Sequence, residues 1–114
     1  MSQRNPQVIL DEMLQCVTLI GTYIAGLTAE TFEQQPALQD AVMHRIEILG
    51  EVASQLPDAI KSVHAEVPWR SIVDMRNRLI HGYYAVRLDL VWQVAMTEVP
   101  ALEPALRAIR DGLP

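Results

Sequence analysis

Hydrophobic residues recur every three to four positions along most of this chain, which is the spacing of one face of an α-helix. Asn5 and Pro6 precede the first such stripe, and an Asn cap followed by proline is a common helix start. The stripe consists of Val8, Ile9, Met13, Cys16, Val17, Ile20 and Ile24. The pattern therefore predicts a long helix that begins at Pro6 and ends near Ala25-Gly26.

Prolines divide the rest of the chain into further helices. Pro36 opens a second stripe that should end before Pro57, because the residue preceding a proline is pushed out of the helical region. Short helices are expected after Thr28, whose hydroxyl can act as a cap, and over residues 58–64.

Pro68 should begin another helix that runs to Gly82. Asp89 should cap the last helix, and Pro100 and Pro104 should kink or break it. We find no strand pattern, repeat or low-complexity tract. These elements predict an all-α, up-down bundle of four or five helices that forms one domain over residues 1–114.

Composition refines this picture. Hydrophobic residues make up 50 % of the 114 positions and charged residues 20 %, which is typical of a globular chain. So much apolar content in a small bundle indicates that part of the surface is buried against a second copy of the chain or against another protein. Cys16 is the single cysteine and fits a reducing compartment. We see no signal peptide, and the apolar run over residues 16–27 is too short to cross a bilayer. The expected location is the cytoplasm, with no membrane partner.

The net charge of -5 argues against a general nucleic-acid coat protein. Between residues 70 and 89, however, four arginines stand against two aspartates. The arginines are Arg70, Arg76, Arg78 and Arg87. A basic patch on an acidic body would suit a small phosphate-bearing target.

The most informative segment is residues 76–83, Arg-Asn-Arg-Leu-Ile-His-Gly-Tyr. Arg76 can bind phosphate through a planar fork of donors, and His81 can exchange a proton near neutral pH. On a continuous helix Arg76 and Tyr83 would share a face, and Asn77 and His81 would be neighbours. Arg76 and His81 would then diverge by roughly 140°. Either the chain leaves the helix at His81, or two copies supply the two groups. The same residues also fit a solvated helix face that ends in a His cap.

Other residues offer weaker signals. His44, Glu47 and Glu51 share a helix face and resemble half of a metal site, but the matching Glu-x-x-His pair is missing, so we expect neither metal nor cofactor. Glu47 and Glu51 can instead pair with Arg45, Arg76 or Arg78. Gly50 should mark a close helix–helix contact. Trp69 and Trp92 are expected to be core or interface anchors.

The motif R-x4-H-x-Y, spanning Arg76 to Tyr83, resembles the signature of the HEPN superfamily and of HepT-like toxins in particular. Similar blocks occur in the expected order at residues 45–51, 68–70 and 88–92, and the likeness covers roughly residues 6–112. The resemblance implies a dimeric helical bundle whose two motifs meet at the interface. It also implies a metal-independent endoribonuclease of a toxin–antitoxin pair. The resemblance further implies that the antitoxin would be an MntA-type minimal nucleotidyltransferase that attaches AMP to the motif tyrosine.

Carried over to this chain, the resemblance makes Arg76 and His81 catalytic and Asn77 their polar helper. Tyr83 becomes the AMP acceptor, with Tyr84 as the ambiguous neighbour. Glu47, Glu51 and Arg78 give possible support to the site. The substrate would be RNA and not DNA, since the attacking group is the 2′-hydroxyl.

One alternative is a non-catalytic module that binds a nucleotide, or presents a substrate, for a minimal nucleotidyltransferase. Another is a scaffold whose helix face docks a partner. The intact Arg, His and Tyr favour the nuclease over both.

Overall fold

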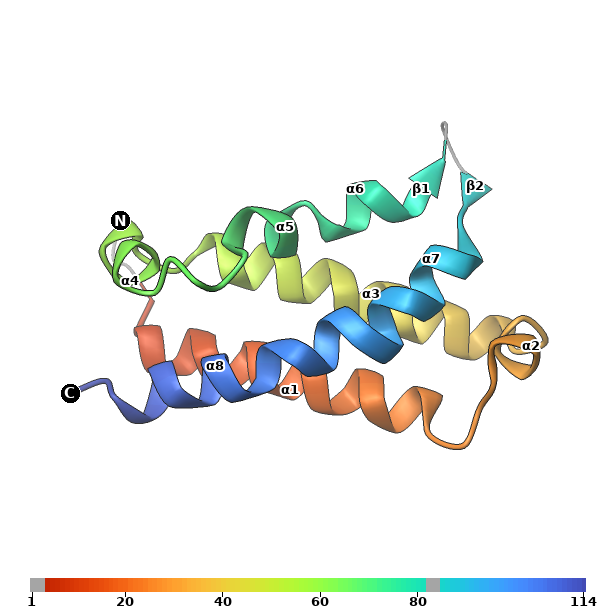
Figure 1. Ribbon diagram of the computed structural model, residues 1–114, viewed down its shortest axis with the longest axis horizontal. Helices are drawn as coiled ribbons and strands as arrows, with labels where there is room; N and C mark the ends of the chain where they lie inside the picture. Colours follow the sequence, from red (N-terminus) through yellow and green to blue (C-terminus); the bar gives the residue numbers. More distant parts are fainter. Residues whose placement is uncertain (1–3, 82–84) are drawn as a thin grey trace.

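Three long helices dominate the computed structural model, which describes residues 4–81 and 85–114. Helices α1 (Pro6–Ile24) and α3 (Pro36–Ser54) have 19 residues each, and α8 (Val99–Asp111) has 13. Helix α1 packs along both α3 and α8 (Figure 1). The described chain is therefore an all-α bundle, as the hydrophobic pattern predicts.

Local capping explains where the first elements begin and end. Asn5 Oδ1 accepts a 2.8 Å hydrogen bond from the backbone N–H of Gln7, and Pro6 is the first residue of α1. After α1, Gly26 takes a φ of 78°, which favours glycine. Helix α2 (Ala29–Phe32) begins with a reciprocal capping pair. The N–H of Thr31 donates a 3.1 Å bond to the Thr28 hydroxyl, and the N–H of Thr28 donates a 2.8 Å bond to the Thr31 hydroxyl. These boundaries confirm the predicted ones.

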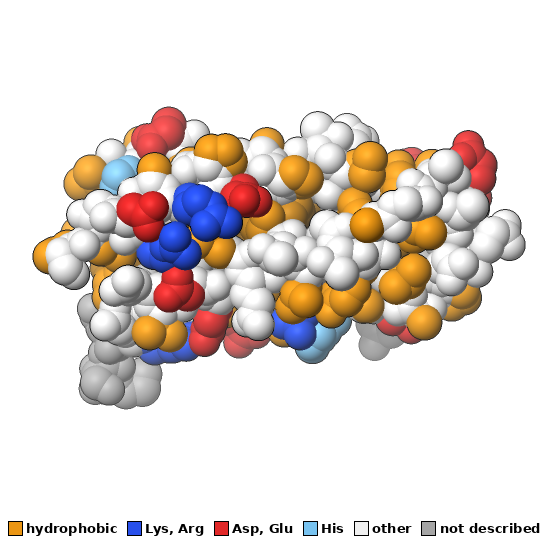
Figure 2. All heavy atoms as spheres, turned by 90° about the horizontal axis from the view of Figure 1, so that it is seen from below, with side chains coloured by type: hydrophobic (Ala, Val, Ile, Leu, Met, Phe, Trp, Pro, Cys, Tyr) orange, Lys and Arg blue, Asp and Glu red, His pale blue; other side chains and the backbone are white. Residues whose placement is uncertain are grey.

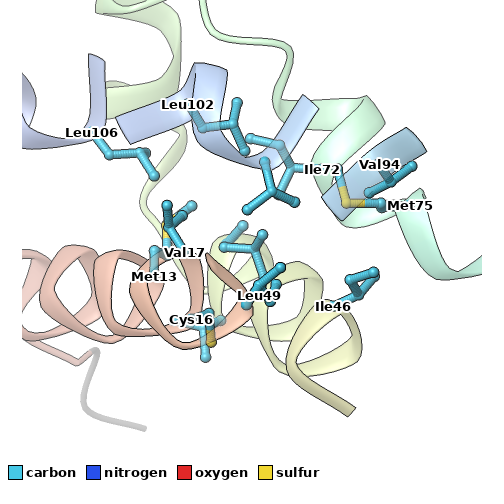
Figure 3. Packing of buried hydrophobic residues seen from close by; sticks show 14 of the residues in the cluster. Met13, Cys16, Val17, Ile46, Leu49, Ile72, Met75, Val94, Leu102 and Leu106 are labelled. Atoms are coloured by element: carbon cyan, nitrogen blue, oxygen red, sulfur yellow. The ribbon is translucent and has the colours of Figure 1, made fainter. Parts of the chain in front are cut away.

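The core lies where α1, α3 and α8 meet the segments that follow Pro68. Figure 3 shows Met13 and Val17 of α1, Leu49 of α3, and Leu102 and Leu106 of α8 converging on one cluster. All five side chains are buried. Burial of such a side chain contributes about 1.5–3 kcal/mol relative to exposure.

The two tryptophans anchor short elements to this core, as predicted. Trp69 Nε1 donates a 3.0 Å hydrogen bond to the backbone oxygen of His64, which follows α4 (Asp58–Val63). Trp92 lies against Phe32 with ring centroids 5.3 Å apart, which joins the C-terminal segment to α2. Both indoles are partly buried against the core.

The predicted helix from Pro68 to Gly82 is wrong in two respects. It is broken at Asp74 into α5 (Trp69–Val73) and α6 (Met75–Leu79), and α6 ends before an extended Ile80 with φ -104° and ψ 124°. The chain then forms β1 (Ile80–His81), which pairs antiparallel with β2 (Ala85–Val86). The N–H of Arg87 also donates a 2.7 Å bond to the Leu79 oxygen. A hairpin thus supplies the hydrogen bonds that a longer helix would have made.

The last helical segment also differs from the prediction. Helix α7 (Leu88–Gln93) has Arg87 at its cap, so Asp89 lies in the first turn and does not cap it. A π-helical turn, η1 (Val94–Glu98), then joins α7 to α8, and the Val99 N–H bonds the oxygen of Val94 five residues earlier. Pro100 has no N–H for a regular helical bond, so the expected irregularity takes the form of a wider turn just before it. The break expected at Pro104 does not occur, because α8 runs past this residue to Asp111.

Charged side chains of both signs are interspersed on the outer face of this bundle. Figure 2 shows blue and red groups side by side near one end of the face that it draws. Among the ion pairs of the described residues, Arg110 bonds to Asp11 and Asp111. No helix within residues 4–81 and 85–114 combines the length and apolarity needed to cross a bilayer.

Candidate functional site

Arg76 is held in place by a carboxylate from another helix. Its Nε donates a 2.9 Å hydrogen bond to Oε1 of Glu47, which lies 29 residues earlier on α3. The side chains of Arg76 and Glu47 are 50 % and 45 % exposed. Within the described residues, the two terminal nitrogens of Arg76 have no hydrogen-bond partner. Glu47 therefore holds the guanidinium through Nε, and the two terminal nitrogens remain available to bind an anion.

Gly50 allows α5 to approach α3 beside this ion pair. A Cβ atom added at Gly50 would lie 3.0 Å from the backbone oxygen of Ile72 and 3.1 Å from that of Val73. Real Cβ atoms seldom come so close to backbone oxygens, so a side chain here would push the two helices apart. The close contact predicted at Gly50 is confirmed.

A groove of about 270 Å³ runs between α3 and the α5–α6 segment. The groove is lined by Glu47 and Glu51 of α3 and by Arg76 and Asn77 of α6. Val73 and Gly50 form part of its wall. Glu51 makes no ion pair with any described residue. The groove thus brings four of the sequence-predicted site residues together: Glu47, Glu51, Arg76 and Asn77.

Asn77 bonds to an aspartate at the break between two short helices. Its Nδ2 donates a 2.8 Å bond to Oδ1 of Asp74, at the break between α5 and α6. Because α6 ends at Leu79, Asn77 and His81 are not neighbours on one helix, and that prediction is wrong. The backbone of His81 lies in β1, opposite Ala85.

Three expectations fall outside the described part of the chain. Tyr83 and Tyr84 are not among the described residues, and neither is the side chain of His81. The shared helical face proposed for Arg76 and Tyr83 nevertheless loses its premise, because the helix stops four residues before Tyr83.

Carboxylates largely neutralise the expected basic patch. Arg78 pairs with Glu98 of η1 at 2.7 Å, and Arg87 pairs with Asp89 at 3.0 Å. The hydrogen bond from Arg87 lowers the pKa of the Asp89 carboxyl below its ordinary value. The sequence pattern did not reveal Glu98 as the partner of Arg78. These two residues lie 20 positions apart, and only the fold brings them together.

Within residues 4–81 and 85–114, no three His, Cys, Asp or Glu side chains gather as ligands of one ion would, and this includes His44, Glu47 and Glu51. The site chemistry offered by the described residues is that of a guanidinium beside carboxylates.

Comparison with known proteins gives a consistent result. The family model described as "Ribonuclease HepT-like" matches residues 13–109. A protein of Caldanaerobacter subterraneus subsp. tengcongensis named "Putative RNase" is 32 % identical over 93 % of this chain and 95 % of its own length. A protein of Thermococcus cleftensis named "Probable ribonuclease HepT" is 29 % identical over 95 % of this chain and 98 % of its own length.

A longer relative comes from Methanocaldococcus jannaschii and is named "Gamma-glutamylcyclotransferase and putative RNase". It is 32 % identical over 97 % of this chain, which spans 50 % of that protein. No solved structure matches the chain. The family model covers most of the chain, including the segment with Arg76 and His81, and the chain therefore belongs to the HepT-like ribonuclease family.

Proposed function

We propose that this protein is a metal-independent endoribonuclease and the toxin of a toxin–antitoxin pair. The observation that carries the proposal is the Arg76–Glu47 pair, which presents a guanidinium with free terminal donors five residues before His81. Membership in the HepT-like ribonuclease family supports RNA as the substrate. The chain forms one domain, and no cofactor enters the proposed reaction.

The reaction uses the nucleophile that RNA itself carries. Neutral His81 removes the proton of the 2′-hydroxyl, whose oxygen attacks the adjacent phosphorus. The 2′-oxygen–phosphorus bond forms as the bond to the leaving 5′-oxygen breaks, and a second His81 returns a proton to that oxygen. The terminal nitrogens of Arg76 stabilise the charge that builds on the non-bridging oxygens. The products carry a 2′,3′-cyclic phosphate and a 5′-hydroxyl, and DNA is not cut.

The need for a second His81 makes the active site a property of a homodimer. Arg76 lies on α6 and the backbone of His81 on β1, so the two positions are no longer tied to one helical face. Two copies whose hairpins meet can place both imidazoles on opposite sides of one phosphate. This arrangement also uses the surplus of apolar residues.

Regulation acts through the motif tyrosine. An MntA-type nucleotidyltransferase antitoxin adds AMP to the Tyr83 hydroxyl, with Tyr84 as the neighbouring alternative. The added phosphate is negative and bulky, so it competes with RNA for Arg76 and blocks the approach of the strand. AMP addition therefore silences the nuclease.

Expression in a bacterial host tests this proposal. The wild-type chain should arrest growth, whereas Arg76→Ala and His81→Ala should not. Co-expression of the nucleotidyltransferase should restore growth with wild type but not with Tyr83→Phe, and Tyr84→Phe is the matched control. If His81→Ala is as toxic as wild type, the nuclease proposal fails. If wild type and His81→Ala are both non-toxic and both bind a nucleotide, this chain is the non-catalytic nucleotide-binding partner.

A further inference from the structure

Two cations and an indole gather on the surface between α4 and α5, outside the Arg76 groove. Two adjoining hollows of about 490 and 590 Å³ share Lys61, Trp69 and Arg70 in their linings. Arg70 is exposed, and Lys61 and Trp69 are partly exposed. The proposed nuclease mechanism uses none of these three residues.

The pairing of the cations sets this surface apart. Within residues 4–81 and 85–114, six of the nine Lys and Arg residues make an ion pair with a carboxylate, and the other three are Arg45, Lys61 and Arg70. Lys61 and Arg70 make none within the described residues, although Asp58 and Asp74 also line the hollows. The Asp74 carboxylate instead accepts the hydrogen bond from Asn77. Both cations are therefore available to an outside anion.

Trp69 gives the same surface a fixed aromatic wall. Its Nε1–H is bonded to the His64 oxygen, so the ring is held in one orientation while its partly exposed portion lines the hollow. Single-stranded nucleic acids are bound by this combination, in which cations contact backbone phosphates and aromatic rings stack with bases.

The 490 Å³ hollow also adjoins the candidate active site. Val73 lines both the hollow and the Arg76 groove. Asp74 lines the hollow and is bonded to Asn77, which lines the groove. A strand whose scissile phosphate lies at Arg76 can continue across Val73 to Lys61 and Arg70.

We propose that Lys61, Trp69 and Arg70 form a binding subsite for single-stranded RNA, in which each of the two cations holds a backbone phosphate and Trp69 stacks on a base. This inference rests on the proposed ribonuclease function and extends it from the scissile phosphate to the flanking nucleotides. The subsite increases affinity for the strand and does not take part in bond cleavage.

The test measures RNA binding in a His81→Ala background, where the strand stays intact. The probe is a fluorescein-labelled, random-sequence 20-nucleotide RNA, followed by anisotropy in EDTA at several salt concentrations. Lys61→Gln/Arg70→Gln should raise Kd about tenfold and lower the slope of log K against log salt by about 1.4, or roughly 0.7 for each lost phosphate contact. Lys61→Arg/Arg70→Lys keeps both charges and should bind as the parent does.

A matched control removes the same charge elsewhere. Arg107→Gln/Arg110→Gln changes two cations of α8, and Kd should change less than about twofold. Trp92→Phe leaves Trp69 as the remaining tryptophan, and its emission should then be quenched when the RNA binds. The subsite is refuted if the Lys61/Arg70 variant binds as tightly as the parent, if the Trp69 emission does not change, or if the parent does not bind RNA.

The two proposals fail in different ways. A wild-type protein that does not cleave RNA refutes the ribonuclease, whatever the affinity. A wild-type protein that cleaves RNA, with equal affinity in the Lys61/Arg70 and Arg107/Arg110 variants, refutes the subsite alone.

Discussion

Replacing Glu47 tests whether its ion pair with Arg76 is needed for RNA cleavage. Glu47→Ala removes the acceptor of the 2.9 Å bond from Arg76 Nε and leaves the guanidinium free to rotate. Both side chains are about half exposed, and such ion pairs contribute roughly 0.2–1 kcal/mol to folding. The free energy of unfolding should therefore fall by less than about 1 kcal/mol, so the variant stays folded.

The effect on catalysis should be much larger than the effect on stability. A displacement of a catalytic group by about 1 Å can cost roughly 100-fold in rate. We expect Glu47→Ala to lower kcat by about 10- to 100-fold. KM should stay constant or fall, because a carboxylate that repels the phosphate has been removed. Glu47→Gln keeps an oxygen acceptor for Arg76 Nε and should remain within about threefold of wild-type kcat.

The assay is steady-state cleavage of a fluorogenic RNA, with urea unfolding of each variant measured in parallel. Glu103→Ala is the matched control, because Glu103 pairs with Arg107 on α8 at 3.2 Å and the side chains are 43 % and 49 % exposed. The control should lose as little stability as Glu47→Ala and keep its kcat. If Glu47→Ala cleaves RNA at the wild-type rate, Glu47 does not position Arg76 for catalysis.

Three further predictions concern the frame of the site. Gly50→Ala gains about 1 kcal/mol of helix propensity but places a Cβ 3.0 Å from the Ile72 oxygen. Urea unfolding should therefore show that the free energy of unfolding falls by about 1–2 kcal/mol, and a rise would contradict the close packing. Leu49→Ala removes a fully buried side chain and should cost about 2–5 kcal/mol by the same measurement. Burial raises the pKa of the Cys16 thiol, so Ellman's reagent at pH 8 should react with it in urea and not in the folded protein.

The sequence predicted those elements whose boundaries depend on local chemistry. Asn5-Pro6 fixes the start of α1, and Thr28 caps α2, through contacts within a few residues. Gly50 was correctly identified as a close contact, since a glycine in the middle of a helix needs a packing reason.

The errors arose where distant residues decide the structure. Ile72, Met75 and Leu79 have the spacing of one helix, so the pattern could not reveal the break at Asp74. The end of α6 depends on Arg87, whose N–H reaches the Leu79 oxygen, and on the hairpin register. Asn77 and His81 are not helical neighbours because α6 ends at Leu79, between them.

The candidate site was predictable as a set of residues but not as a set of contacts. Glu47 was among several possible partners for the arginines, and only the packing of α3 against the α5–α6 segment selects Arg76. The pairing of Arg78 with Glu98 depends on η1, a π-helical turn that the hydrophobic pattern does not encode.

Cleavage of RNA in EDTA tests whether this protein is a metal-independent ribonuclease. Wild type, shown by mass to carry no AMP, would be compared with Arg76→Ala and His81→Ala on messenger, transfer and ribosomal RNA. Wild type should cleave RNA into fragments with 2′,3′-cyclic phosphate ends and should leave DNA intact, and neither variant should cleave RNA. An unmodified wild type that leaves every RNA intact, or a His81→Ala protein that cuts equally well, would contradict this prediction.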